Sequence, residues 1–253
     1  MQSVTEEIGR QVRVPDGQVA SVEVEALFSV GAHLGYGKST RHPKMKEYIF
    51  GNRNNVEIFD LERTVEKLKS AENYLHELGV NKKIVLWVGT KPAAAPAIEA
   101  TAKKLGAPYV NERWLGGTLT NFKIIETRLA YWAELEREKE TGGFDKYVKK
   151  EKLLKMVEMR KLQRMLGGIK NLKFLPEAVV IIDPKEENTA FSESRRKKIP
   201  VVALLNTDCD PRGISYPVPA NDNSTSSISL ILDRLASAYE AGTKEVKPAV
   251  PTQ

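Results

Sequence analysis

The hydrophobic pattern of the chain alternates between short apolar runs and longer amphipathic stretches. The apolar runs predict buried strands at residues 84–88, 109–110, 178–182, 201–205 and around Val218. The amphipathic stretches predict helices at residues 61–78, 93–105, 187–197 and 227–241. Gly79 and Gly106 are expected to cap the first two of these helices. Strands that alternate with helices indicate an α/β domain whose parallel sheet is covered by helices on both faces.

The N-terminal part of the chain follows a different pattern. Residues 1–20 have no period and contain a Pro-Asp-Gly turn sequence, so we expect a flexible extension. Residues 22–30 predict a short amphipathic helix. Two further apolar runs, joined by turn residues, predict a β-hairpin with strands at 48–50 and 56–59.

Between Thr118 and Leu166 two helical stretches follow one another with no strand between them. The first has an apolar stripe stepping by three or four residues, formed by Phe122, Ile125, Leu129, Trp132 and Leu135. The second, at residues 146–166, has a matching stripe formed by Leu153, Met156, Met159, Leu162 and Leu166. Two such stripes joined by a Gly-Gly break predict an antiparallel helical hairpin, a coiled coil with helices about 30 Å long.

These elements define the expected domain organisation. An α/β core of residues 21–117 and 168–241 is interrupted by the hairpin, which occupies residues 118–167. The last residues, 242–253, contain prolines and are expected to form a disordered tail.

The positive charge is concentrated in the hairpin region. Residues 128–173 include 13 Lys or Arg and 7 Asp or Glu, a net charge of +6. The whole chain has 39 and 33, also +6, so the remainder balances at 26 against 26. Smaller basic clusters remain around Lys38 to Arg53 and at residues 195–198. A basic excess of this kind favours a polyanionic partner such as nucleic acid.

Composition excludes several classes of protein. Cys209 is the single cysteine, so neither an internal disulfide nor a cysteine-based zinc site is possible. The first residues lack the apolar core of a signal peptide, and no apolar run approaches the roughly 20 residues of a membrane span. We therefore expect a soluble, cytoplasmic protein with no membrane partner.

Two motifs suggest small-molecule chemistry, and each has a simpler explanation. Gly37-Lys38-Ser39 ends like a phosphate-binding P-loop, but the first glycine of that motif should stand at Ala32. A nucleotide-binding enzyme on a doubly wound fold is thus the less favoured alternative. Asp183, Asp208 and Asp210 could meet at the carboxyl ends of strands and bind a cation. Their neighbouring prolines favour turns and caps instead, so we predict no cofactor, metal or catalytic residue.

The segment from Tyr109 to Phe122, YVNERWLGGTLTNF, combines a strand end, a tight turn and a helix start. Trp114 is expected to pack at the root of the hairpin, because tryptophans are mostly buried. The alternative is an RNA contact made by Trp114 together with Arg113.

At this point the sequence resembles a known family, the bacterial small-subunit ribosomal protein two. The resemblance runs from Val24 to about Tyr239 and rests on five stretches in order: HPKMKEYIFGNRNNVEIFDLERT, LWVGTK, YVNERWLGGTLTNFKII, LGGIKNLKFLPEAVVIIDPKEE and IPVVALLNTDCDP. Two positions depart from the family pattern. Arg41-His42 stands where the family usually has Trp-Asn, and Gly35-Tyr36 stands where it has Gly-His.

The resemblance implies a flavodoxin-like three-layer α/β/α domain with an inserted helical hairpin. It also implies a structural, non-enzymatic role on the small ribosomal subunit, bound to 16S rRNA near the head–body junction and to neighbouring ribosomal proteins. In bacteria the family supports docking of ribosomal protein one.

The charge pattern suggests which residues contact RNA. Basic residues near the hairpin tip are one group: Lys146, Lys149, Lys150, Lys152 and Lys155. A second group lies in the Gly-rich segment: Lys38, Arg41, Lys44 and Lys46. Arg113 is a further candidate. Such cations bind phosphates and release counterions.

Overall fold

The computed structural model describes residues 22–245. Within this range the main sheet has five parallel strands in the order β5-β4-β6-β7-β8. The strands are β4 (Val85–Val88), β5 (Tyr109–Val110), β6 (Ala178–Ile182), β7 (Val201–Leu205) and β8 (Tyr216–Pro219). Counted from β4, this is the order 2-1-3-4-5 of flavodoxin-like folds. The predicted fold class is therefore confirmed.

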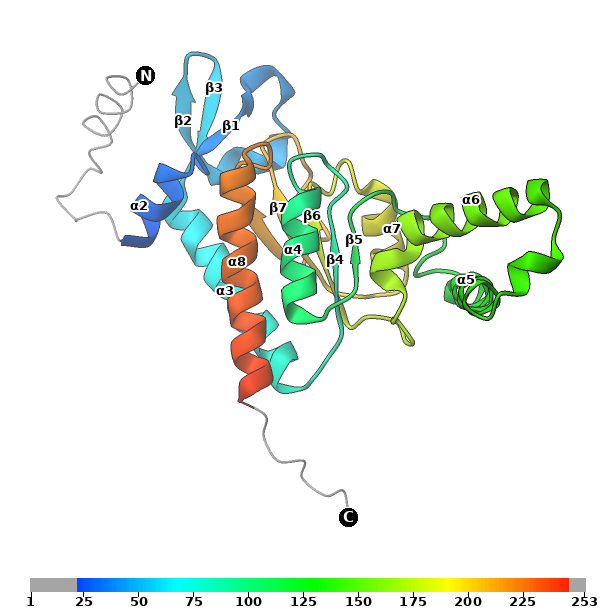
Figure 1. The fold of residues 1–253 in the computed structure, drawn as a ribbon. Coiled ribbons are helices and arrows are strands. Elements are labelled where there is room, and N and C mark those ends of the chain that lie inside the picture. Colours follow the sequence, from blue (N-terminus) through cyan, green and yellow to red (C-terminus); the bar gives the residue numbers. More distant parts are fainter. Residues whose placement is uncertain (1–21, 246–253) are drawn as a thin grey trace.

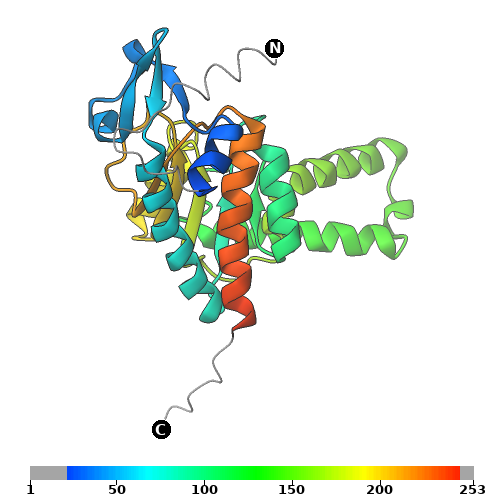
Figure 2. The same ribbon diagram turned by 90° about the vertical axis from the view of Figure 1, so that its left-hand side faces the viewer.

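Helices cover both faces of this sheet. On one face lie α2 (Val22–Ser29), α3 (Leu61–Val80), α4 (Ala95–Leu105) and α8 (Thr225–Lys244). Figure 2 shows α3, α8 and α4 side by side on this face. The opposite face is covered by α7 (Asn188–Arg196), the segment around Trp114 and the roots of the hairpin. The strands are buried on both sides, which explains why β4, β6 and β7 are apolar throughout.

A smaller antiparallel sheet packs over the carboxyl ends of the parallel strands (Figure 1). Its order is β1-β3-β2, with β1 at Leu34–Gly37, β2 at Ile49–Arg53 and β3 at Val56–Phe59. The β2–β3 hairpin was predicted. β1 was not, because its sequence, LGYG, has two glycines and reads as a loop.

Gly79 does not cap α3, contrary to the prediction. The helix continues to Val80, and Gly79 is buried against Gly242 of α8. A Cβ on Gly79 would overlap the carbonyl oxygen of Tyr239, and a Cβ on Gly242 would overlap that of His76. Gly106, in contrast, caps α4 with a φ of 63°, as predicted.

The inserted hairpin consists of α5 (Phe122–Glu140) and α6 (Lys149–Leu166), and it projects from the domain (Figures 1 and 2). The apolar stripe predicted for α5 is largely confirmed, since Ile125, Trp132 and Leu135 are buried. The second stripe is wrong at Leu153, whose side chain is 62% exposed. Residues 143–146 form a separate 3-10 turn, so α6 also starts three residues later than predicted.

The last helix of the domain ends beyond the predicted C-terminal boundary. α8 extends to Lys244, so the predicted tail begins too early at 242. The remainder of that tail and the predicted extension at residues 1–20 lie outside the described residues.

Candidate nucleic-acid interface

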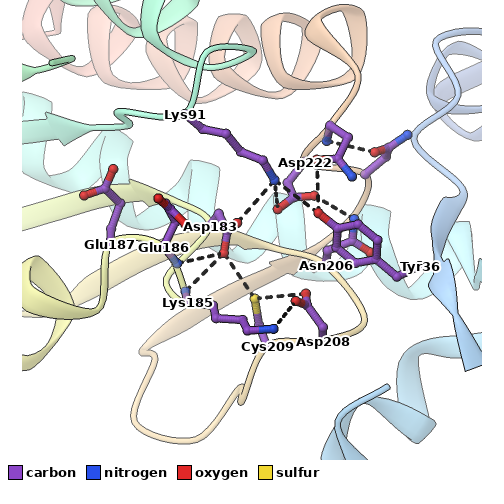
Figure 3. Close-up of polar contacts among 12 residues, drawn as sticks. Tyr36, Lys91, Asp183, Lys185, Glu186, Glu187, Asn206, Asp208, Cys209 and Asp222 are labelled. Atoms are coloured by element: carbon purple, nitrogen blue, oxygen red, sulfur yellow. Dashed lines mark hydrogen bonds and ion pairs between the residues drawn. The ribbon is translucent and has the colours of Figure 1, made fainter. Parts of the chain in front are cut away.

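The carboxyl edge of the parallel sheet, where ligands of flavodoxin-like folds bind, is filled by the protein's own side chains (Figure 3). Lys91, after β4, has its Nζ 2.9 Å from Oδ2 of Asp222 and 3.2 Å from Oδ2 of Asp183. The same Nζ lies 3.3 Å from the hydroxyl of Tyr36 on β1. Asn206, after β7, donates to Asp222 over 2.6 Å. The small sheet is thereby attached to the edge of the large one.

An ammonium group therefore occupies the place between two carboxylates that a cation would take. Burial alone would lower the pKa of Lys91, but the hydrogen bond and charge of Asp222 raise it above its ordinary value. Among residues 22–245 no group of three His, Cys, Asp or Glu side chains is arranged to hold a metal ion. The three aspartates considered from the sequence do not form one site.

Instead, these aspartates stabilise turns, as favoured from the sequence. Asp183 Oδ1 accepts hydrogen bonds from the amides of Lys185 and Glu186, at 3.1 and 3.3 Å. Asp208 pairs with the Nζ of Lys185 at 2.7 Å. Asp210 lies apart and forms a bidentate pair with Arg212. Cys209 is buried between Asp183 and Asp208, and burial, with those charges, raises the pKa of its thiol.

The geometry does not support phosphate binding at the Gly37-Lys38-Ser39 sequence. A P-loop connects a buried strand to an α-helix, whereas Gly37 ends a half-buried strand of the small antiparallel sheet and Lys38–Thr40 forms a short 3-10 helix. In the loop between β4 and α4 the amide of Thr90 donates to the carboxylate of Glu187, at 2.7 Å. The side chain of Glu187 thus already occupies the position at which a phosphate would accept this hydrogen bond.

Trp114 packs at the hairpin root, as predicted, and is 8% exposed. Its indole Nε1 donates to the buried carboxylate of Glu193 on α7, at 3.1 Å. Glu193 also accepts from the amides of Gly117, Leu119 and Thr120 at 2.7–3.0 Å. Burial acts to raise the pKa of Glu193, but these donors outweigh it and hold that pKa below its ordinary value. One carboxylate therefore fixes the turn that leads into α5.

Glu193 was not identified from the sequence, since the sequence around it, SESRR, looks like an exposed helix end. The available signal was the run of amide donors in the turn LGGTL, which needs an acceptor.

Arg41 has a structural partner. Its Nη1 lies 2.9 Å from Oε1 of Glu57, whose side chain is only 1% exposed. A buried carboxylate of this kind requires a counter-charge, so part of the Arg41 guanidinium is engaged within the protein. Glu57 was also missed from the sequence, although an acid within the apolar run VEIF is a sign of such a pair.

The hairpin tip contains its own small cluster, which engages three of the five predicted lysines. Glu138 on α5 pairs with Lys146 at 3.0 Å and with Lys155 at 2.8 Å. Lys155 also lies 3.9 Å from the ring centroid of Tyr147. Hydrogen bonds from Lys155, Lys146 and Tyr147 lower the pKa of Glu138 to about 2. Lys152 pairs with Asp145 at 2.7 Å.

The other predicted cations are exposed and form no ion pair within the described part of the chain: Lys38, Lys44, Lys46, Arg113, Lys149 and Lys150. They fall into two surfaces far apart in the sequence. We call Lys149 and Lys150 the tip surface, and Lys38, Lys44 and Lys46 the loop surface. Arg113 lies separately, beside Trp114. Exposed, unpaired cations are available to phosphates without the loss of an internal partner.

Comparison with known families agrees with the fold. Of the helices described, none is both long and apolar enough to span a bilayer. A family model described as Ribosomal protein S2 matches residues 27–242, which covers the α/β core and the inserted hairpin. The chain therefore belongs to the ribosomal protein S2 family, whose members are structural proteins of the small ribosomal subunit.

Proposed function

We propose that this protein is a structural constituent of the bacterial small ribosomal subunit that binds 16S rRNA through its tip and loop surfaces. The observation that carries the proposal is the set of five exposed lysines on those surfaces that form no ion pair among residues 22–245. Arg113 is a further contact. The family match and the sequence stretches typical of its bacterial members support this assignment.

The paired residues have a supporting role in this proposal. Lys146, Lys152 and Lys155 hold the hairpin tip in one shape, and Arg41 neutralises Glu57 beneath the loop surface. They add positive potential near the RNA without giving up their partners. Lys149 and Lys150 begin α6 beside this cluster and project from its rigid base.

Binding of this kind is electrostatic and depends on shape. Folded RNA presents phosphates and 2′-hydroxyls rather than readable base edges, so cations on a rigid frame suit it. Each phosphate contact releases counterions, and affinity therefore falls steeply as salt rises.

Charge reversal on the two surfaces tests the proposal. The variants are Lys149→Glu with Lys150→Glu, and Lys38→Glu with Lys44→Glu and Lys46→Glu. The control is Lys103→Glu with Lys104→Glu, an adjacent exposed pair at the end of α4. Incorporation into small subunits reconstituted from 16S rRNA and the other subunit proteins is measured at several salt concentrations.

We expect both test variants to reduce incorporation relative to wild type, and the control to leave it near wild type. Loss of one phosphate contact should also lower the salt dependence of binding by about one unit of the log–log slope. If neither test variant differs from the control at any salt concentration, the proposal is wrong.

Neighbouring proteins of the subunit are proposed as further partners, including ribosomal protein one where it is present. One observation favours a protein contact on the hairpin. Leu153, Leu154 and Val157 of α6 are 62%, 60% and 53% exposed, and aliphatic side chains suit a protein surface better than RNA. Crosslinking within reconstituted subunits should link α6 to a protein. Links from α6 to rRNA alone would exclude this contact.

A further inference from the structure

Two segments with exposed cations lie together at the amino end of the parallel sheet, opposite the end occupied by Lys91. Residues 173–177 lead into β6, and residues 195–200 lead from α7 into β7. β6 and β7 are neighbours, with Val179 opposite Val201, and the amide of Val179 donates to the carbonyl of Pro200 at 3.1 Å. The two segments therefore enter the sheet side by side. We define the amino-edge surface as Lys173, Phe174, Arg195, Arg196, Lys197 and Lys198.

Phe174 is the unusual member of this surface, because its side chain is 71% exposed. Its neighbours in the chain are anchored, since Leu172 and Pro176 are buried. The backbone on both sides is thus held in place while the ring faces solvent. An exposed aromatic ring presented from a fixed backbone is a stacking platform for a planar group.

The cations of the amino-edge surface are free to bind an anion. Lys173, Arg196, Lys197 and Lys198 are exposed and form no ion pair in the region 22–245. Arg195 is positioned by the protein, with its guanidinium carbon 5.7 Å from the ring centroid of Phe191. The nearby carboxylate of Glu177 is already engaged by Lys83 at 3.5 Å and by the amide of Ile84 at 2.9 Å.

From this arrangement we infer that the amino-edge surface binds an unpaired nucleotide of the RNA, with its base stacked on Phe174 and its phosphates on the flanking cations. The inference depends on the proposed function, since it adds a third surface to the same partner. Five cations on the same surface as one exposed ring match a base with its flanking phosphates. A protein partner would instead need a larger apolar centre than a single phenylalanine provides.

This site differs in kind from the tip and loop surfaces. The tip and loop surfaces are defined by lysines alone, which suit the phosphates of helical RNA. The amino-edge surface requires a base that is not paired, such as one in a loop or bulge. A salt-independent component of binding is expected here, because stacking does not release counterions.

Photo-crosslinking of the full-length protein tests the inference. Small subunits are reconstituted with 16S rRNA containing 4-thiouridine, irradiated, and digested so that the crosslinked peptides can be identified. The variants are Phe174→Ala, Phe174→Trp, and Lys197→Glu with Lys198→Glu. Two controls lie on the opposite face of the sheet: Val22→Ala, an 81% exposed apolar residue, and Lys103→Glu with Lys104→Glu.

We expect crosslinks in the peptide that contains Phe174, at one or a few uridines. Phe174→Ala should weaken binding roughly 5- to 100-fold, the range for loss of one stacked base, and Phe174→Trp should restore it. Lys197→Glu with Lys198→Glu should weaken binding and flatten its salt dependence, and both controls should behave as wild type.

The two proposals fail in different ways. If the protein enters subunits normally but Phe174→Ala binds as tightly as wild type and residues 173–198 give no RNA crosslinks, the amino-edge site is wrong while the proposed function stands. If the wild-type protein does not enter subunits, the proposed function itself fails.

Discussion

Lys91 and Asp222 face each other at a distance of 2.9 Å, and Asp222 is completely buried. Lys91 follows β4 and Asp222 follows β8, the first and last strands of the parallel sheet in chain order. Asp183, which follows β6, is the third member of this arrangement. A single ammonium group thus balances two carboxylates at the edge where related folds bind their ligands.

Lys91→Met should therefore be strongly destabilising. It leaves two carboxylates without their counter-charge, and breaking a buried pair in this way costs about 3–5 kcal/mol. Urea unfolding followed by circular dichroism measures the free energy of unfolding. Adding Asp222→Asn to the same chain should recover part of the loss, because one of the unbalanced charges is removed. A loss below about 1 kcal/mol, on the scale of exposed pairs, would contradict this account.

Gly242→Ala should destabilise the packing of α3 against α8. The new methyl group would overlap the carbonyl oxygen of His76, and overpacking of this kind costs about 1–3 kcal/mol or more. Gly167→Ala is the matched control, since its Cβ meets nothing within 4 Å and its backbone is helical. That control should be neutral or stabilise by about 0.5–1 kcal/mol. Equal thermal midpoints for the two variants would refute the close-approach explanation.

Glu193→Gln should loosen the turn between Trp114 and Thr120. The charge that several amide donors share is lost, which is expected to cost about 3 kcal/mol. Hydrogen exchange should accelerate at the amides of Gly117, Leu119 and Thr120, while Glu186→Gln, an exposed neighbour, leaves it unchanged. Because the folded pKa of Glu193 is lowered, its contribution is present above pH about 4.5 and is lost as pH falls through the folded value.

Acid should open the contacts of the hairpin tip only as the pH approaches 2. The pKa of Glu138 is lowered to about 2 by Lys155, Lys146 and Tyr147, so these contacts stay intact above its ordinary value and are lost as pH falls toward 2. An NMR titration of the Glu138 carboxyl carbon should give a midpoint near that value. Glu138→Gln should perturb the signals of Phe144 and Tyr147 and leave those of Trp87 in the sheet unchanged. A midpoint near 4.5 would show that the tip cluster does not form in solution.

Local pattern was enough to predict most of the fold. Apolar runs such as Ala178–Ile182 and the periodic stripe through Trp132 give strands and helices because burial dictates their composition. Leu153 was misassigned because the side of α6 that faces α5 runs through Lys155, Met159, Leu162 and Leu166, and Leu153 lies off this line of positions. Gly79 was misassigned because a glycine near a helix end is compatible either with a helix cap or with close packing of another backbone. The packing of α8 against Gly79, which distinguishes the two, cannot be read from the local sequence.

The polar interactions of the site were less predictable, because they join residues far apart in the sequence. Glu193 and Trp114 are 79 residues apart, and Lys91 and Asp222 are 131 apart. Composition identified the lysines of the hairpin as a group. It did not separate Lys149 and Lys150 from Lys146, Lys152 and Lys155, which differ only in whether a carboxylate happens to lie within reach.

The attachment of β1 to the carboxyl edge also has a consequence for the timing of folding during synthesis. The Tyr36 hydroxyl donates to Asn223, which is 187 residues later in the chain, and the Asn221 amide donates to the carbonyl of Ala32. The first segment of the domain to emerge during translation therefore cannot reach its final position until nearly the last strand has been made. Contacts between residues so far apart in the sequence form late and slowly. The small N-terminal sheet should therefore stay undocked and exposed until residues 221–223 have been synthesised.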